Sequence, residues 1–309
     1  MHVMYLKALS LRILQPFSRY RTYSGFGTTT QKRYVANMTT TFTIPNSSVT
    51  LELCQGARKE EVLEFPAFKK WYTRTQSNLS LQSQSTHEFH SAPYALTHIQ
   101  IQSLDRWGPR IGFIKLTATI KNLNDESLPG SIFLRGASVG MLVILQPDDL
   151  PEGSQAEKYV LLTLQPRIAA GSLQFLELPA GMVDNGTFKG SAAKEIKEEL
   201  GLDIPEDELV NMSELAISQK KDGEEEMPRA MFPSAGGCDE CIPLFLHERR
   251  VPREQLKEWT GKLTGLRDEG EKITLKLVKM GDLWWEGARD AKALGALALY
   301  EGLKRVGRL

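Results

Sequence analysis

The chain has 309 residues, of which 41% are hydrophobic and 25% are charged. This length corresponds to about two domains of ~150 residues, and the composition is ordinary for a globular protein with a sizeable core. A collagen-like chain, a disulfide scaffold and a chain that is disordered throughout are excluded. No apolar run approaches the ~18 uncharged residues of a membrane helix, so we predict no membrane partner.

Charge is distributed unevenly, although 38 basic and 38 acidic residues give a net charge of zero. Residues 1–51 carry six basic residues and no Asp or Glu, which leaves 32 of the 38 basic residues and all 38 acidic residues to 52–309. The body of the protein is therefore mildly acidic. It lacks the basic footprint of a protein that binds nucleic acid, so we predict no nucleic-acid partner.

The first predicted segment, residues 1–38, has the composition of a transit peptide. It is basic, free of acidic residues and rich in Ser, Thr and Tyr. Leu6, Leu9 and Ile13 recur at helical spacing, with basic residues between them that exclude a secretory apolar core. We predict import into the mitochondrion. A plastid or cytoplasmic location is the alternative, and in the cytoplasmic case the segment is a basic tail.

The next segment, residues 39–130, is predicted to form a smaller β-rich domain that ends at the Pro129-Gly130 break. Its strands read as Thr-rich or alternating runs, and the turn cluster around Gly108-Pro109 predicts a hairpin. The predicted elements are a strand over 39–56, a helix over 59–73, a polar loop over 77–91 and strands over 96–103 and 110–121.

Residues 131–309 are predicted to interleave strands with helices, which indicates an α/β or α+β fold. The longest apolar stretch, 139–145, indicates a buried strand. The predicted strands cover 138–146, 158–165, 174–178, 209–218, 242–248 and 272–278, and the predicted helices cover 190–200, 253–263 and 288–304.

The helix predicted over 190–200 carries three carboxylates on one face. At ~100° per residue, Glu198 and Glu199 lie about 60° and 40° on either side of Glu195. A pair of such charges ~5 Å apart at an effective dielectric of ~20 repels by on the order of 3 kcal/mol. A hard divalent cation such as Mg²⁺, which prefers oxygen ligands, relieves this repulsion. The alternative is a solvated face paired with Lys194 and Lys197.

The surroundings of this helix resemble the Nudix box, the signature of the Nudix hydrolase family. The helical half of the box is Arg-Glu-aliphatic-x-Glu-Glu-x-Gly-aliphatic, and this chain departs from it only at Lys194, which replaces Arg. In the upstream half, Gly181 lies one residue closer to Lys194 than the box requires. Gly186-Thr187 stands where the box has a supporting Glu. The matching residues are Gly181, Glu195, Ile196, Glu198, Glu199, Gly201 and Leu202.

The resemblance implies a fold, a metal site and a cofactor. The fold is a Nudix α/β/α sandwich around a mixed sheet, in residues 131–309, preceded by the smaller β-rich domain. Glu195, Glu198 and Glu199 would be metal ligands, together with the carbonyl of Ala180 or Gly181. The metal implied is Mg²⁺, with Mn²⁺ as the alternative. The family also implies a homodimer in which the N-terminal domain serves dimerisation and part of the substrate pocket.

Three further stretches resemble the ADP-ribose/ADP-sugar pyrophosphatase branch of the family: residues 165–181, 232–240 and 265–271. By this resemblance Arg167 would contact a substrate phosphate, and Glu240 would lie in a loop beside the metals. Glu269 or Glu271 would be the base for the attacking water. For each of these residues the alternative is an ordinary surface charge.

The resemblance implies hydrolysis of the diphosphate bond of a small-molecule ADP-sugar, ADP-ribose or ADP-glucose, to AMP and a sugar phosphate. A Nudix-fold module that binds ADP-ribose-like ligands without hydrolysing them is the alternative, because Thr187 and Lys194 depart from the box. A broad nucleoside-diphosphate hydrolase is a third possibility.

A second constellation, Cys238 and Cys241 with His87 and His90, has the residue types of a zinc site. The two pairs lie 147 residues apart and lack the usual finger spacing. A redox dithiol is a second reading of the cysteine pair. We favour two structural thiols that flank Glu240.

Overall fold

A computed structural model describes the chain from residue 40 onward, within a unit that runs from Met38 to Leu309. The predicted transit peptide over 1–38 lies outside the described residues. None of the described helices is long and apolar enough to cross a membrane. The described residues are 40–183, 187–201, 203–218, 221, 223–265 and 272–309.

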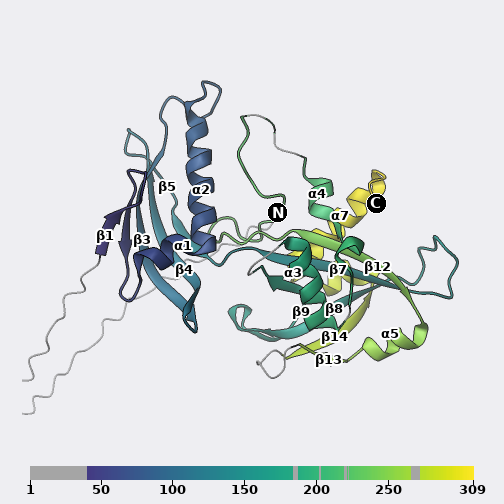
Figure 1. Cartoon of the computed structure of the whole chain (residues 1–309). Coiled ribbons are helices and arrows are strands. Elements are labelled where there is room, and N and C mark those ends of the chain that lie inside the picture. The colour runs from purple at the N-terminus through teal and green to yellow at the C-terminus, as the bar shows by residue number, and fades with distance from the viewer. Residues whose placement is uncertain (1–39, 184–186, 202, 219–220, 222, 266–271) are drawn as a thin grey trace, which may run out of the picture. The chain divides into compact units, whose positions relative to one another are not determined.

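A first sheet is built from the N-terminal strands (Figure 1). β2 and β3 pair in parallel through a helical crossover, α1 (Lys59–Glu64) and α2 (Pro66–Ser80), and the remaining pairs are antiparallel. The order is β1-β2-β3-β4-β5, with β6 also on β4. The strands are β1 (Thr40–Thr43), β2 (Thr50–Leu53), β3 (Ala95–Trp107), β4 (Arg110–Lys121), β5 (Ser127–Leu128) and β6 (Ser131–Leu134).

The first sheet has its own hydrophobic core, to which α2 contributes the buried side chains of Phe68 and Trp71. Two local predictions differ from the structure here. In the described part of the strand predicted over 39–56, Thr40–Thr43 and Thr50–Leu53 form two antiparallel strands and not one, with Asn46 in the left-handed region at φ 59° between them. The predicted helix over 59–73 is two helices, because Pro66 starts a new helix at a position where its missing N–H costs nothing.

The hairpin of β3 and β4 is longer than predicted, since the strands continue to Trp107 and resume at Arg110. Gly108 turns the chain at φ 58°. The Trp107 indole packs against Gly112, where a Cβ would overlap the ring. β6 joins this sheet, so pairing with β4 extends past the predicted boundary at residue 130. The division into domains 39–130 and 131–309 stays a prediction.

A second, eight-stranded sheet follows in the order β11-β12-β7-β8-β14-β13, with β10 on β7 and β9 on β8. It is mixed, because β12 and β7 run parallel and the other pairs are antiparallel. Its strands are β7 (Ser138–Pro147), β8 (Tyr159–Arg167), β9 (Ser172–Glu177), β10 (Ala180–Met182), β11 (Val210–Asn211), β12 (Leu244–Val251), β13 (Leu263–Thr264) and β14 (Ile273–Lys279).

Helices cover both faces of this sheet (Figure 1). Alternate side chains of β7 enter two cores: Val143 packs with α3 (Phe188–Glu195), η3 (Ile196–Leu200) and α5 (Arg253–Trp259), whereas Ile144 packs with the helices of the other face. Those helices are α4 (Met212–Ala216), α6 (Leu283–Glu286) and α7 (Ala291–Arg305). The predicted α/β/α sandwich around a mixed sheet is therefore confirmed.

The predicted strand over 209–218 is wrong after its first residues. β11 ends at Asn211, whose side chain accepts a hydrogen bond from the Glu214 N–H and so starts helix α4. Asn is a favoured N-cap because its oxygen satisfies an N–H that has no partner within the helix. Four short 3₁₀ turns complete the described elements: η1 (Leu81–Ser83), η2 (Ile168–Ala170), η4 (Glu206–Glu208) and η6 (Met280–Asp282).

Candidate active site

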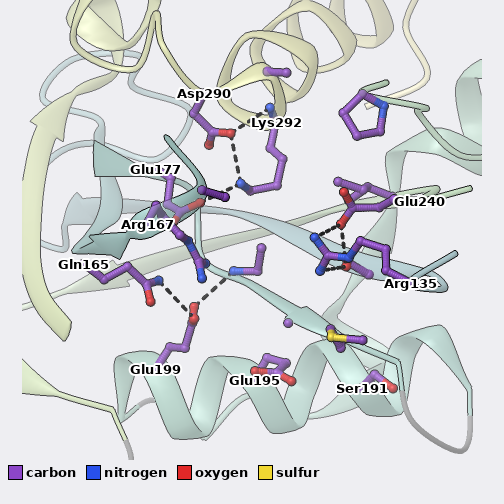
Figure 2. A pocket seen from close by; sticks show the side chains of 18 of the residues that line it. Arg135, Gln165, Arg167, Glu177, Ser191, Glu195, Glu199, Glu240, Asp290 and Lys292 are labelled. Carbon is purple, nitrogen blue, oxygen red and sulfur yellow. Dashed lines mark hydrogen bonds and ion pairs between the residues drawn. The ribbon is translucent and has the colours of Figure 1, made fainter. Parts of the chain in front are cut away.

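A cavity of about 700 Å³ lies where β8, β9 and β10 meet α3 and the first turn of α7. Figure 2 shows the side chains that point into it from these elements. The lining is rich in charged groups of both signs. The charged side chains of the lining are Arg135, Arg167, Glu177, Lys194, Glu195, Glu199, Glu240, Asp290 and Lys292.

The helix that carries the acidic residues is not uniform. Thr187 caps its start, since its hydroxyl accepts a hydrogen bond from the Gly190 N–H. After Glu195 the α-helix widens into the π-helical turn η3, which ends at Leu200 and is capped by Gly201 at φ 67°. Single π-turns within α-helices are frequent at functional sites. Thr187, which occupies the region where the Nudix box has a Glu, thus has a structural role of its own.

The wider turn changes which carboxylates share a face. In η3 the hydrogen bonds run i→i+5, so each residue rotates by less than the ~100° of an α-helix. Glu199 consequently moves toward the direction of Glu195, and Glu198 moves further from it. Glu195 and Glu199 line the cavity, whereas Glu198 lies outside its described lining and pairs with Lys194 at 3.6 Å.

Glu199 is a buried carboxylic acid with few compensating contacts. It is 5% exposed, and its carboxylate accepts hydrogen bonds from the Ala180 N–H at 3.0 Å and from Gln165 Nε2 at 3.4 Å. Burial raises its pKa to about 8, and the charges of Glu195 and Glu177 act in the same direction. Negative charge is therefore disfavoured at Glu199 unless a cation is close by.

Glu195 lies directly against the backbone of β10. A Cβ at Gly181 would overlap the Glu195 carboxylate, so only glycine leaves room for it. β10 is fixed in turn by its pairing with β7, where Gly181 is opposite Val139. Gly181, which the resemblance to the box singled out, therefore leaves the space that the carboxylate of Glu195, one of the predicted metal ligands, occupies.

These residues fit a hard divalent cation. Carboxylate and carbonyl oxygens are the donors that Mg²⁺ and Mn²⁺ prefer, and the Glu195–Glu199 pair, with the backbone of Ala180 and Gly181, gathers them at one wall of the cavity. Within the part of the chain that the structure describes, no three His, Cys, Asp or Glu side chains already form a metal-binding group. Glu198 stays a predicted ligand.

Glu240 lies on another wall of the cavity, in the loop before β12. Its Oε1 accepts a hydrogen bond from Ser138 Oγ at 2.8 Å and pairs with Arg135 Nη1 at 3.2 Å. The neighbouring Asp239 holds the backbone N–H groups of Arg135 and Gly136. Sequence reasoning placed Glu240 in this region but missed Arg135, which no local motif marks.

Arg167 ends strand β8 and reaches the cavity beside Glu177. Its Nε donates a hydrogen bond to Glu177 Oε1 at 2.6 Å, while Lys292 Nζ bonds the other carboxylate oxygen at 2.8 Å. Sequence reasoning missed Glu177, Lys292 and Asp290. The signals available were the position of Glu177 directly before Leu178-Pro-Ala-Gly and that of Asp290 as the N-cap of a helix.

Two further predicted residues, Glu269 and Glu271, lie outside the described residues. Among those described, Cys238 and Cys241 form no disulfide, and burial raises the pKa of both thiols. His90 bonds the Gln82 carbonyl. These contacts favour the interpretation as structural side chains over a zinc site or a redox dithiol.

Comparison with known proteins gives the following matches. No protein-family model matches the chain. A curated protein of Arabidopsis thaliana, "Nudix hydrolase 14, chloroplastic", is 33% identical over 269 residues, which covers 85% of this chain and 80% of that protein. A solved structure, "Crystal structure of ADP compounds hydrolase", matches with a TM-score of 0.45 and 17% identity, over 70% of this chain and 97% of the other.

Proposed function

Because the chain belongs to the Nudix hydrolase family, we propose that it hydrolyses the diphosphate bond of ADP-sugars, such as ADP-ribose and ADP-glucose, to AMP and a sugar phosphate. The observation that carries this proposal is the Glu195–Glu199 pair at the wall of a cavity that also holds Arg167. A cavity of about 700 Å³ has the size of a small-molecule site. The name of the Arabidopsis relative, a hydrolase, supports turnover over binding alone.

Glu195, Glu199 and Glu198, with the carbonyl of Ala180 or Gly181, are the proposed holders of Mg²⁺ or Mn²⁺. Such an ion supplies charge neutralisation of the diphosphate and polarises its phosphoryl oxygens. The protein's own part is to keep two carboxylates together in a buried wall, and Gly181 and the Ala180 N–H do this.

The remaining groups bind and orient the substrate. Arg167 presents a planar cation to the cavity, and guanidinium groups match phosphate geometry with two parallel hydrogen bonds. Glu240, held by Arg135 and Ser138, lies across the cavity as a fixed carboxylate. Deprotonation of the attacking water is proposed for Glu269 or Glu271. Positioning and electrostatics account for most of the rate enhancement in phosphoryl transfer.

The test is AMP release from ADP-ribose and ADP-glucose by the full chain with Mg²⁺, with Mn²⁺ and with EDTA. We expect turnover with a divalent ion, none with EDTA, and a loss of at least about 100-fold in Glu199→Gln, the order found when a group that stabilises the transition state is removed. Glu301→Gln, at an exposed position of α7, is the control that retains full activity. Equal rates in Glu199→Gln and wild type would refute the role of the acidic pair.

A binding module without turnover is the second candidate. Two observations favour it: Thr187 serves as a helix cap where the box has a Glu, and Lys194 replaces Arg. Calorimetry separates the candidates, since a module binds ADP-ribose without releasing AMP under any metal condition. A wider panel of nucleoside diphosphates would reveal a broad hydrolase.

Import into an organelle and assembly into a homodimer complete the proposal. The composition of residues 1–38 supports import, and the Arabidopsis relative is named chloroplastic, so a plastid is proposed beside the mitochondrion. Fusion of residues 1–38 to a fluorescent protein distinguishes the two organelles. Light scattering of the purified chain measures the oligomeric state.

A further inference from the structure

Four charged side chains form a connected cluster at one end of the cavity: Arg167, Glu177, Lys292 and Asp290 (Figure 2). We propose that Glu177, Lys292 and Asp290 are positioning residues that hold the Arg167 guanidinium in place to bind a phosphate group of the ligand. The inference rests on the proposed function, because it assigns the substrate's diphosphate as the anion that Arg167 receives.

Burial separates the four members into two kinds. The side chains of Glu177, Asp290 and Lys292 are 3%, 4% and 13% exposed, whereas that of Arg167 is 42% exposed. Ions that are taken out of water in this way are poor stabilisers on their own, since desolvation offsets much of their attraction. Arg167 is thus the member that a ligand can reach most readily, and the three buried residues form the connected network that holds it.

The carboxylate of Glu177 divides its two oxygens between two cations. Oε1 accepts from Arg167 Nε at 2.6 Å, and Oε2 accepts from Lys292 Nζ at 2.8 Å. The bond to Glu177 uses Nε and not the two terminal nitrogens of the guanidinium, on a side chain that lines the cavity. Lys292 offsets the charge of Glu177, so that the acid orients Arg167 without fully neutralising it.

Asp290 anchors the cluster to the backbone of two elements. Its Oδ2 accepts from the Leu178 N–H at 2.8 Å, and its Oδ1 accepts from the Lys292 N–H at 3.0 Å and Nζ at 2.9 Å. It is also the N-cap of α7, where the helix dipole favours a negative charge. The end of β9 and the start of α7 are thereby joined, and Lys292 is held in one position.

Such anchoring has a consequence for binding. A long cationic side chain loses rotamer freedom when it grips an anion, and a guanidinium that is already fixed loses less. Removal of Lys292 takes away one of the two cations that bond Glu177, so Glu177 attracts the Arg167 guanidinium more strongly and shifts it away from the position from which it reaches the cavity. We therefore expect the loss of ligand affinity in a Lys292 variant to arise from the displacement of Arg167.

Lys292 lines the cavity itself, and direct contact with the ligand is the competing explanation. A double-mutant cycle distinguishes the two, because a residue that acts through Arg167 has no effect once Arg167 is gone. The cycle uses Arg167→Gln, Lys292→Met and the double variant, in the full chain. The measurement is the Kd for ADP-ribose by calorimetry in EDTA, so that the readout is independent of metal and of turnover.

We expect Arg167→Gln to raise the Kd about tenfold or more, the order of one charged hydrogen bond. Lys292→Met should raise it about threefold to tenfold by the same reasoning, and the double variant should match Arg167→Gln alone. Lys292→Arg, which keeps a cation at the site, should recover most of the affinity. Arg305→Met, at the exposed end of the same helix, is the matched control with an unchanged Kd.

Three results would overturn the inference. Additive losses in the double variant would show that Lys292 contacts the ligand directly. An unchanged Kd in Lys292→Met, with only a lower melting temperature, would assign the cluster to stability alone. If the wild type neither binds ADP-ribose in EDTA nor releases AMP from it with Mg²⁺ or Mn²⁺, the proposed function fails. The same cycle is then run with inorganic pyrophosphate, and absence of its binding to the wild type would refute the inference as well.

Discussion

Replacement of Gly181 by Ala tests the packing of the acidic site most directly. The added Cβ would overlap the Glu195 carboxylate, which lies against the α-carbon of Gly181. The backbone of β10 is held by its pairing with β7, so the flexible end of the Glu195 side chain is the group that must move away. Because a side-chain end yields more easily than backbone, the cost should lie at the low end of overpacking, about 1 kcal/mol, or a fall of about 2–4 °C in melting temperature.

The assay is thermal unfolding followed by circular dichroism, together with AMP release at saturating Mg²⁺. Gly302→Ala is the control: Gly302 lies in α7, has open space at its Cβ and should gain up to about 1 kcal/mol in helix propensity. The two glycine variants should therefore move the melting temperature in opposite directions. Full stability and full turnover in Gly181→Ala would show that the Glu195 carboxylate does not rest on this glycine.

Three further variants test other parts of the structure. Ile196→Ala, at a fully buried position of the helix that bears the acids, should lose about 2–5 kcal/mol in urea unfolding, and a loss below about 1 kcal/mol would contradict its core position. Thr187→Ala removes the cap on the Gly190 N–H and should cost about 0.5–2 kcal/mol in the same assay, whereas Thr187→Ser should not. The hydrogen bond from Arg106 lowers the pKa of Glu61 from 4.5 to about 2, so this ion pair stabilises the fold above pH 4.5 and is lost as the pH falls toward about 2. Glu61→Gln should remove about 1 kcal/mol at pH 6 and flatten the pH dependence in that window, and an unchanged acid unfolding curve would refute it.

Local sequence patterns predicted the second sheet well where an apolar run is buried on both faces and can form only a central strand. The apolar run over 139–145 forms β7, because this strand is covered on both faces and needs no polar side. The same reasoning failed over 209–218, where a largely apolar stretch was predicted as a strand but Asn211 caps a helix. The Asn211 cap, the burial of Met212 and the hydrogen bond from the Leu244 N–H to Ser213 all favour the helix there, and the last two depend on tertiary contacts that a local pattern does not contain.

In the candidate site, too, some residues come together because they are close in sequence, whereas others meet only through the fold. Gly181, Glu195 and Glu199 belong to one short motif, and their spacing sufficed to bring them to one wall of the cavity. Lys292 is 115 residues from Glu177, and their ion pair arises only because α7 begins beside the end of β9. No periodicity or spacing in a single sequence encodes that contact.

Glu198 shows that spacing within the motif did not predict which carboxylates line the cavity, although its role as a metal ligand stays a prediction. Regular α-helical rotation would set it about 60° from Glu195, close enough to share a cation. The π-turn η3 reduces the rotation per residue, so Glu198 leaves the shared face while Glu199 approaches it. Ile196 and Leu200 are fully buried in the core beneath this turn. Because that packing holds the widened turn in place, the side chains on the opposite face determine which carboxylates meet in the cavity.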